Sequence, residues 1–274
     1  MLQSFQNHIL YEENKKRMSN TLPVPSQSHL VVIPSYNTGK ILQKTVEEAI
    51  QLWAPVWVII DGSTDDSVKL LQPLVDKYSD NLKVIELEHN VGKGAAILHA
   101  ILLAQKKGYT HVLTMDADHQ HPAEYIAEFM RQSKKSMEAM IFGQPVFDQS
   151  APAIRVQGRK ISNNWVNLET LSWDIKDSLF GMRVYPINDL VKVMQSTRWA
   201  RRFDFEPEVA VRMAWCGVKT VNIETPVRYL LEEEGGVTQF RYLRDNILLT
   251  WMHVRLFFGF VIRLPYLLFN KTIK

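Results

Sequence analysis

The chain has 274 residues, of which 46% are hydrophobic and 22% charged, a balance typical of globular proteins and unlike that of disordered chains. Its formal net charge of +3 is too small to predict nucleic acid as a partner, and the single cysteine, Cys216, excludes an intrachain disulfide and a cysteine-rich zinc site. The first residues, MLQSFQNHILYEENKK, lack the basic start and apolar run of a secretion signal, so we expect a cytoplasmic protein.

Residues 1–28 are polar and contain PVPSQS, which is typical of a leader followed by a linker. Beyond them, short apolar runs alternate with helical patterns. The expected strands are 30–34, 56–60, 82–87, 111–116 and 218–223, and the expected helices are 38–53, 67–80, 94–108 and 207–215. This order predicts an α/β fold, a Rossmann-like and mainly parallel sheet with helices on both faces, which binds ligands beyond the carboxyl ends of its strands.

Two aspartates, Asp116 and Asp118, close the apolar run HVLTM. If the strand continues to its end, their side chains point to the same face. Neighbouring carboxylates repel each other, and a magnesium ion that also binds phosphate oxygens would relieve this repulsion. The same triplet also occurs in solvated loops, but here it stands at a strand end and before a helix opened by Pro122. His119 and His121 are further candidate ligands, although we favour a place in the turn before Pro122 for His121 and simple packing or solvent exposure for His119.

Five motifs occur in order between about Leu30 and Arg228: VVIPSYN, IIDGSTDDS, HNVGKGAA, MDADHQHP and DSLFGMRVYP. Together they resemble family 2 glycosyltransferases with the GT-A fold, in particular the branch that includes dolichyl-phosphate mannose synthase. The resemblance implies a GT-A domain over 29–235. It also implies metal-dependent, inverting transfer of a sugar from a nucleotide-diphosphate donor to a membrane-associated lipid or polyprenyl-phosphate acceptor, with Mg²⁺ or Mn²⁺ as cofactor.

The resemblance assigns roles to individual residues. Donor contacts are expected from Pro34, Tyr36, Asn37, Asp61, Lys93, Asp116, Asp118 and Arg183. Asp61 would read the base, Asp116 and Asp118 would hold the metal, and Asp118 would be its direct ligand. Acceptor or phosphate contacts are expected from Arg155, Arg159, Lys160 and Gln120.

The chain departs from the family pattern at two places. Ile60 stands where the family often has a first acid, which leaves base selectivity open. Around Gly181 the family has a small residue before the glycine and an aromatic one after it, whereas this chain has Phe180 and Met182.

The acceptor decides whether a general base is needed. An alcohol has to lose a proton, whereas a lipid phosphate is already anionic. The candidate bases are Asp204, Asp177 and Glu206, and for Glu206 the favourable helix dipole at a helix start is an equal explanation. With a phosphate acceptor, Asp177 and Asp204 would only orient their neighbours, and the residues alone leave both cases open.

Residues 236–274 form a basic and apolar tail. The stretch 246–269 is long enough to cross a bilayer, but Arg255, Arg263 and Pro265 disfavour a simple transmembrane helix. We expect one or two helices in the membrane interface at the inner face of the membrane, with packing on the domain or on a second subunit as the alternative.

Two other functions stay open at this point. A sugar-phosphate nucleotidyltransferase has a related sheet but starts with a glycine-rich basic loop, of which IPSYNTGK is a poor version. A non-catalytic nucleotide-sugar binding module is the other alternative.

Overall fold

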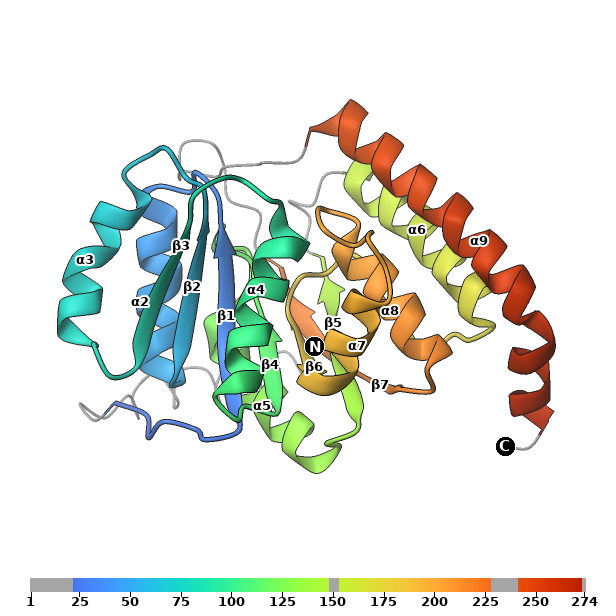
Figure 1. The fold of residues 1–274 in the computed structure, drawn as a ribbon, viewed down its shortest axis with the longest axis horizontal. Helices are drawn as coiled ribbons and strands as arrows, with labels where there is room; N and C mark the ends of the chain where they lie inside the picture. Colours follow the sequence, from blue (N-terminus) through green and yellow to red (C-terminus); the bar gives the residue numbers. More distant parts are fainter. Residues whose placement is uncertain (1–21, 148–152, 228–240, 273–274) are drawn as a thin grey trace.

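The structure is a computed structural model that describes residues 22–147, 153–227 and 241–272, without the side chains of 153–155, 242 and 270–272. The strands are β1 (His29–Ser35), β2 (Val56–Asp61), β3 (Leu82–Leu87), β4 (His111–Thr114), β5 (Ala139–Val146), β6 (Arg183–Pro186) and β7 (Lys219–Pro226). The helices are α2 (Lys40–Leu52), α3 (Ser67–Lys77), α4 (Lys93–Lys106), the short 3₁₀ helix η1 (Ala123–Tyr125), α5 (Ile126–Lys135), α6 (Ala153–Thr170), α7 (Ile187–Gln195), α8 (Phe205–Trp215) and α9 (Tyr242–Thr272). Figure 1 shows their arrangement.

The described strands form a seven-stranded sheet in the order β3-β2-β1-β4-β6-β5-β7. Neighbours in this sheet run parallel except at β6, which is antiparallel to both β4 and β5. The prediction of a mainly parallel α/β sheet covered by helices is therefore confirmed, with β6 as the exception. The carboxyl ends of β1, β2 and β3 lie together at the upper edge in Figure 1.

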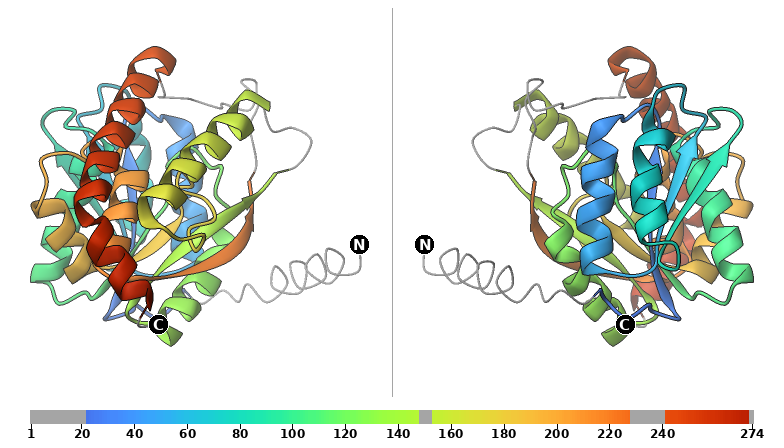
Figure 2. Two further views of the ribbon diagram at one scale, coloured as in Figure 1. Left: turned by 90° about the vertical axis from the view of Figure 1, so that its right-hand side faces the viewer. Right: turned by 90° about the vertical axis from the view of Figure 1, so that its left-hand side faces the viewer.

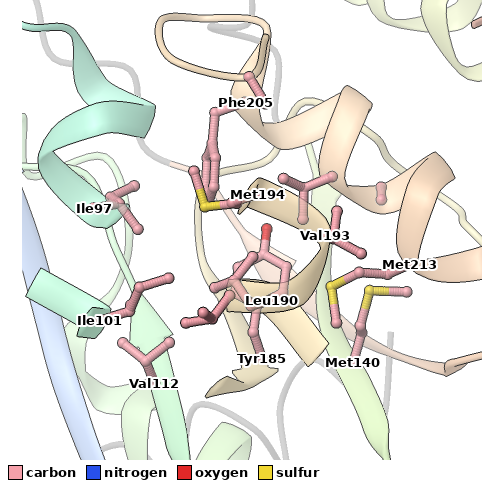
Figure 3. Close-up of a cluster of buried hydrophobic side chains, with 14 of the residues drawn as sticks. Ile97, Ile101, Val112, Met140, Tyr185, Leu190, Val193, Met194, Phe205 and Met213 are labelled. Carbon is pink, nitrogen blue, oxygen red and sulfur yellow. The ribbon is translucent and has the colours of Figure 1, made fainter. Parts of the chain in front are cut away.

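Alternation along the strands builds a core on each face of the sheet. In β1, Leu30 and Val32 belong to a cluster with α4, α7 and α8, whereas Val31 and Ile33 belong to a second cluster with α2, α3 and α5. This is the period-2 pattern of a strand buried on both faces. Figure 3 shows part of the first cluster, where Ile97 and Ile101 of α4 face side chains of α7 and α8.

Helix α9 is one continuous helix that lies along α6 (Figures 1 and 2). It packs on the domain through Met252, Leu256 and Phe260, which are buried and four residues apart. Within α9, the segment Leu243–Phe269 has a mean hydropathy of 1.6 and is long and apolar enough to cross a membrane. The structure thus gives one helix packed on the domain. The expected leader and the expected boundary at 235 and 236 lie largely outside the described residues.

Two buried histidines stack at the opposite, amino edge of the sheet. His29 begins β1 and His111 begins β4, and they are partners in the strand register. Their ring centroids are 4.5 Å apart with planes 8° from parallel. Burial lowers the pKa of His29 from 6.5 to about 4, with smaller contributions from His111 and Lys134. Burial likewise lowers the pKa of His111.

These histidines make folding sensitive to mild acid. Above pH 6.5, His29 is neutral in both the folded and the unfolded state. Between pH 6.5 and about 4, only the unfolded state takes up the proton, so the free energy of unfolding falls as the pH falls. We expect His29 to contribute a loss of about 2 kcal/mol over this range. The measurement is urea unfolding at a series of pH values for the wild type, His29→Gln and the exposed control His99→Gln. An equal pH dependence in all three proteins would contradict the prediction.

Candidate active site

The expected site residues come together at the carboxyl edge of the sheet. β1 leads into Tyr36 and Asn37, β2 ends at Asp61, and β4 leads into the turn that carries the paired aspartates. The first residues of α4 and α8 border the same region, because Lys93 contacts Asp116 of this turn and Glu206 contacts Lys93. We describe the charged groups first, then the loops that hold them.

Three charged side chains form the centre of the site, of which Glu206 is buried and Lys93 and Asp116 are partly buried. Lys93, the first residue of α4, contacts a carboxylate oxygen of both Asp116 and Glu206 through its Nζ atom. Burial alone would lower the pKa of Lys93, but the two carboxylates outweigh it and raise this pKa above its ordinary value. Burial likewise opposes ionisation of Asp116, yet Lys93 and then His121 lower the pKa of its carboxyl to about 2. Lys93 therefore stays charged, and so does Asp116.

The strand β4 ends at Thr114, earlier than expected, so Asp116 and Asp118 lie in the turn after it and not in an extended strand. Asp118 accepts a hydrogen bond from the backbone N–H of Gln120 at 3.1 Å, which tightens this turn. Burial and the charge of Asp116 raise the pKa of Asp118 to about 7. The two carboxylates therefore interact electrostatically even though the strand geometry differs from the expectation.

The two histidines of the turn hold its shape. His121 accepts the backbone N–H of Asp116 through Nδ1 at 3.0 Å, so its neutral form carries the proton on Nε2. Burial lowers the pKa of His121 to about 4. His119 has a left-handed backbone, with φ at 60°, and its Nε2 lies 2.8 Å from Glu48 of α2. Both contacts favour a structural role for these histidines.

The paired aspartates fit a divalent cation. Across residues 22–147, 153–227 and 241–272 there is no group of three or more histidine, cysteine or acidic side chains that could enclose a metal by itself. Burial, and then the ionised Asp116, raise the pKa of the Asp118 carboxyl, and a bound cation would lower it again. Magnesium commonly binds through one or two carboxylates and takes its other ligands from phosphates and water.

Asp61 fixes the loop in front of α4. Its two carboxylate oxygens accept the backbone N–H groups of Val91, at 2.8 Å, and Gly92, at 2.9 Å. Gly62 follows with a positive φ of 64°, and a Cβ atom there would lie 2.4 Å from the backbone of Asn90. Asp61 thus fixes this loop, and its contact with a base stays a prediction.

The end of β1 is tied to the end of β2. Asn37 donates its backbone N–H to Ser63 Oγ at 3.0 Å and accepts the Thr64 N–H with its side chain at 2.8 Å. Pro34 is buried within β1, while Tyr36 is half-buried beside this link. These residues are therefore placed at the edge where a donor is expected, and their donor contacts remain predictions.

The three candidate bases are already engaged, which differs from the expectation for a free base. Asp204 is buried, and its carboxylate accepts the backbone N–H groups of Ala200 and Arg202 at 3.0 and 2.9 Å. Asp177 pairs with Arg159 at 2.7 Å and accepts the N–H groups of residues 179 and 180. Glu206 contacts Lys93. Each carboxylate is used to hold a loop or a cation.

Arg183 is also placed differently from the expectation. It is fully buried beneath the site, stacks on Phe142 at 4.4 Å, and donates to the backbone carbonyls of Phe180 and Glu206 at 2.7 and 2.8 Å. Its guanidinium is thus held by groups of the protein beneath the site, and its contact with a donor stays a prediction. Arg159 lies near Asp116 and His121, since its charge contributes to the pKa of both, while Lys160 is exposed. The side chain of Arg155 lies outside the described residues.

The unusual residues around Gly181 have a packing explanation. The ring of Phe180 occupies the space that a side chain at position 143 would need, because a Cβ on Gly143 would lie 2.2 Å from it. The ring also packs edge-on against His121, with centroids 4.5 Å apart. A Cβ on Gly181 would lie 2.4 Å from the Asp116 carboxylate, so only glycine permits this close approach.

The sequence reading missed the loop 199–204. The carbonyl of Arg201 accepts the N–H of Ala95 at 3.0 Å, and both Gly92 and Gly94 are too close to this loop to carry a side chain. Arg202 reaches Asn90 at 3.5 Å, beside the loop that Asp61 holds. The pair of consecutive arginines directly before FDFEPE is the signal that could have found it.

The glycosyl transferase family 2 profile matches residues 30–205, which include every loop described above. The chain belongs to glycosyl transferase family 2. This family 2 glycosyltransferase is therefore an enzyme of sugar transfer, and the alternative of a nucleotidyltransferase is disfavoured.

Several relatives of this glycosyltransferase act on lipid phosphates by name. It is 26% identical over 220 residues to the polyprenol monophosphomannose synthase of Mycolicibacterium smegmatis, which covers 78% of this chain and 82% of that protein. It is 28% identical to a dolichyl-phosphate beta-glucosyltransferase of Trichomonas vaginalis over 66% of this chain and 59% of that protein.

Solved structures support the same fold. Glucosyl-3-phosphoglycerate synthase from Mycobacterium tuberculosis, in complex with Mn²⁺, UDP-glucose and phosphoglyceric acid, superposes with a TM-score of 0.61. The identity is 13%, and the superposition covers 86% of this chain and 80% of that one. At this identity the likeness shows a shared GT-A-type fold.

The contacts of Lys93 predict how Asp116 titrates. In Lys93→Met, burial of Asp116 remains but its main counter-charge is lost, so the carboxyl pKa should rise from about 2 to above its ordinary value of 3.8. The unfolding free energy should fall by about 2 kcal/mol because the buried Glu206 and the partly buried Asp116 lose their partner. NMR titration of the aspartate carboxyl carbons measures the first effect. Exposed Lys106→Met, on the same helix, is the control, and an unchanged Asp116 in Lys93→Met would refute this account.

Proposed function

We propose that this chain transfers a sugar, with inversion and with the help of a divalent metal, from a nucleoside-diphosphate sugar to the phosphate group of a lipid acceptor. The observation that carries the proposal is the state of the candidate bases. Asp177, Asp204 and Glu206 are all buried and bound to cations or backbone N–H groups. An acceptor that is already anionic needs no such base.

The proposed reaction is a single displacement. A phosphate oxygen of the acceptor forms a bond to the anomeric carbon, while the bond from that carbon to the donor phosphate breaks and nucleoside diphosphate leaves. No proton has to be removed from an ionised phosphate. Attack from the side opposite the leaving group inverts the anomeric centre.

The residues of the chain would serve this reaction mainly by placing charges. Lys93 is held by Glu206 beside Asp116, where its ammonium group faces the expected position of the diphosphate. Arg159, Lys160 and Arg202 supply positive charge around the same edge and would attract the acceptor phosphate. Asp116 and Asp118 would hold Mg²⁺ or Mn²⁺, which when bound neutralises charge on the departing diphosphate.

Two groups of relatives point to different sources of the acceptor phosphate. The relatives named after polyprenol and dolichyl phosphate support a lipid. The synthase of similar fold binds phosphoglyceric acid, which is a soluble phosphorylated acceptor. The exposed apolar side chains of α6 and α9 favour the lipid, because a soluble acceptor gives no reason for them. They are Ile161, Trp165 and Leu168 on α6, and Leu243, Ile247, Trp251, Val254, Phe258, Val261, Ile262, Tyr266, Leu268 and Phe269 on α9.

We call these side chains the outer face of α6 and α9. Two of the three arginines of α9 stack on tryptophans of the domain, Arg255 on Trp199 and Arg263 on Trp215. Arg255 and Arg263 are the charges that disfavour a membrane contact in the sequence, and both are thus directed toward the domain. We infer that the outer face rests on the cytoplasmic surface of the membrane and brings the site close to lipid headgroups.

Transfer assays test the acceptor. We expect transfer to a short polyprenyl phosphate, no transfer to the matching polyprenol, and loss of transfer on chelation of divalent ions and in Asp118→Asn. Donors are screened as UDP- and GDP-sugars, and the product is identified by mass spectrometry. Transfer to 3-phosphoglycerate but not to polyprenyl phosphate would indicate that the acceptor is a soluble phosphate. Binding of donor without any transfer would leave the non-catalytic binding module as the explanation.

Vesicle binding tests the outer face. Phe258 and Ile262 are 64% and 78% exposed. Replacing both by glutamate should weaken binding to phosphatidylcholine–phosphatidylglycerol vesicles by more than about tenfold, since each buried side chain contributes about 2 kcal/mol. The measurement is co-sedimentation. The control is Val24→Glu, a change at an exposed apolar residue that is distant from α9 in the sequence. Equal binding of the wild type, the double variant and this control would count against a membrane contact.

A further inference from the structure

We propose that α9 also supplies positioning residues for the catalytic site: Arg255 and His253 hold, from behind, the two segments that place Lys93 and Asp116. The inference rests on the proposed function in that the site is taken as the catalytic one. It adds a role for residues outside the stretch that matches the family profile, 30–205. One series of contacts leads from Arg255 to the site, and a separate series leads there from His253.

The first series of contacts starts at Arg255. Its guanidinium forms paired hydrogen bonds with the fully buried Glu208, at 3.1 and 3.0 Å, and lies 3.8 Å from Asp204. It also stacks on the ring of Trp199, 4.0 Å from the centroid. Arg255 thereby joins both ends of the segment 199–208. Such a bidentate, stacked arginine fixes orientation as well as charge.

The segment that Arg255 holds is in direct contact with the site. Glu206 lies between Asp204 and Glu208 and contacts Lys93. On the other side, the Arg201 carbonyl accepts the N–H of Ala95, in the first turn of the helix that begins with Lys93. Arg255 therefore restrains Lys93 twice, through its counter-ion and through the start of α4.

The second series of contacts starts at His253. Its Nδ1 lies 3.0 Å from Glu169 Oε1 and its Nε2 lies 3.0 Å from Ser162 Oγ. Ser162 Oγ is 3.3 Å from Ser178 Oγ, whose hydroxyl donates to Asn163 at 2.8 Å. His253, Ser162, Ser178 and Asn163 are thus linked by consecutive hydrogen-bonding contacts. This series of contacts runs from α9 into the loop before Gly181.

The loop before Gly181 packs closely against Asp116. Asp177 pairs with Arg159 and accepts the N–H groups of residues 179 and 180, which lead directly to Gly181. Gly181 lies so close to Asp116 that even a Cβ atom would clash with the carboxylate. A shift of Ser178 is therefore transmitted to the loop against which Asp116 packs. His253 and Arg255 act on opposite sides of the same ion pair.

Arg263 provides a matched control on the same helix. It also stacks on a tryptophan, Trp215, and it donates to the carbonyl of Gly259 in its own helix. Unlike Arg255, it makes no ion pair with the segment 199–208 in the described part of the chain. Loss of Arg263 should affect the docking of α9 without displacing Glu206 or Lys93.

The test compares Arg255→Gln with Arg263→Gln in the full chain. Glu208 keeps its bond to Arg212 at 2.9 Å, so Arg255→Gln should remain folded. We expect hydrogen exchange to become at least about fivefold faster in peptides covering 199–204 and 92–95 in Arg255→Gln only. With polyprenyl phosphate as acceptor, kcat should fall about tenfold while the donor KM changes less than about twofold. Arg255→Lys should restore part of kcat.

The outcomes separate the two proposals. Equal exchange at 92–95 in both variants, or equal kcat in both, would overturn the positioning role even if the wild type transfers sugar. Faster exchange only in Arg255→Gln, in a protein that transfers no sugar, would support the positioning contacts and refute the proposed function. His253→Asn tests the second series of contacts in the same way, with faster exchange expected at 177–181.

Discussion

The Lys93 ammonium group sits between the carboxylates of Asp116 and Glu206, and the three charges come from three different parts of the chain. Asp116 follows the central strand β4, Lys93 begins α4 and Glu206 lies in the first turn of α8. A buried charge is costly unless it is paired, so these elements cannot move apart independently. The packing around them, including glycines at 92, 94 and 181 where no side chain fits, preserves this approach.

The other carboxylates of the site are likewise paired with partners within the protein. Asp61, Asp177 and Asp204 each accept a pair of backbone N–H groups and thereby fix a loop. An enzyme that had to deprotonate an alcohol would need one such group free and accessible. Rigid loops that carry arranged charges are instead suited to an acceptor that arrives ionised, for which orientation and electrostatic stabilisation make the larger contributions.

Local patterns in the sequence predicted the first half of the fold well, because β1 to β4 are apolar runs separated by amphipathic helices. β5 and β6 were not among the predicted strands. β5 contains Gly143 and Pro145, and β6 is short and begins with the buried Arg183. The roles of Asp204 and Arg183 depend on partners that are distant in the sequence or on backbone groups, which no spacing in the sequence reveals. Phe180 looked like a departure from its family until the space left by Gly143 explained it.

The antiparallel placement of β6 has a consequence for the order of folding. β4 pairs with β1 on one side and with β6 on the other, and β6 begins only at Arg183. While the ribosome has made only the first half of the chain, β4 is an open edge with unpaired backbone groups and apolar side chains. Such an edge is a template for unwanted pairing between nascent chains. The strand that leads to the paired aspartates is therefore the part of this sheet most in need of protection until synthesis is well advanced.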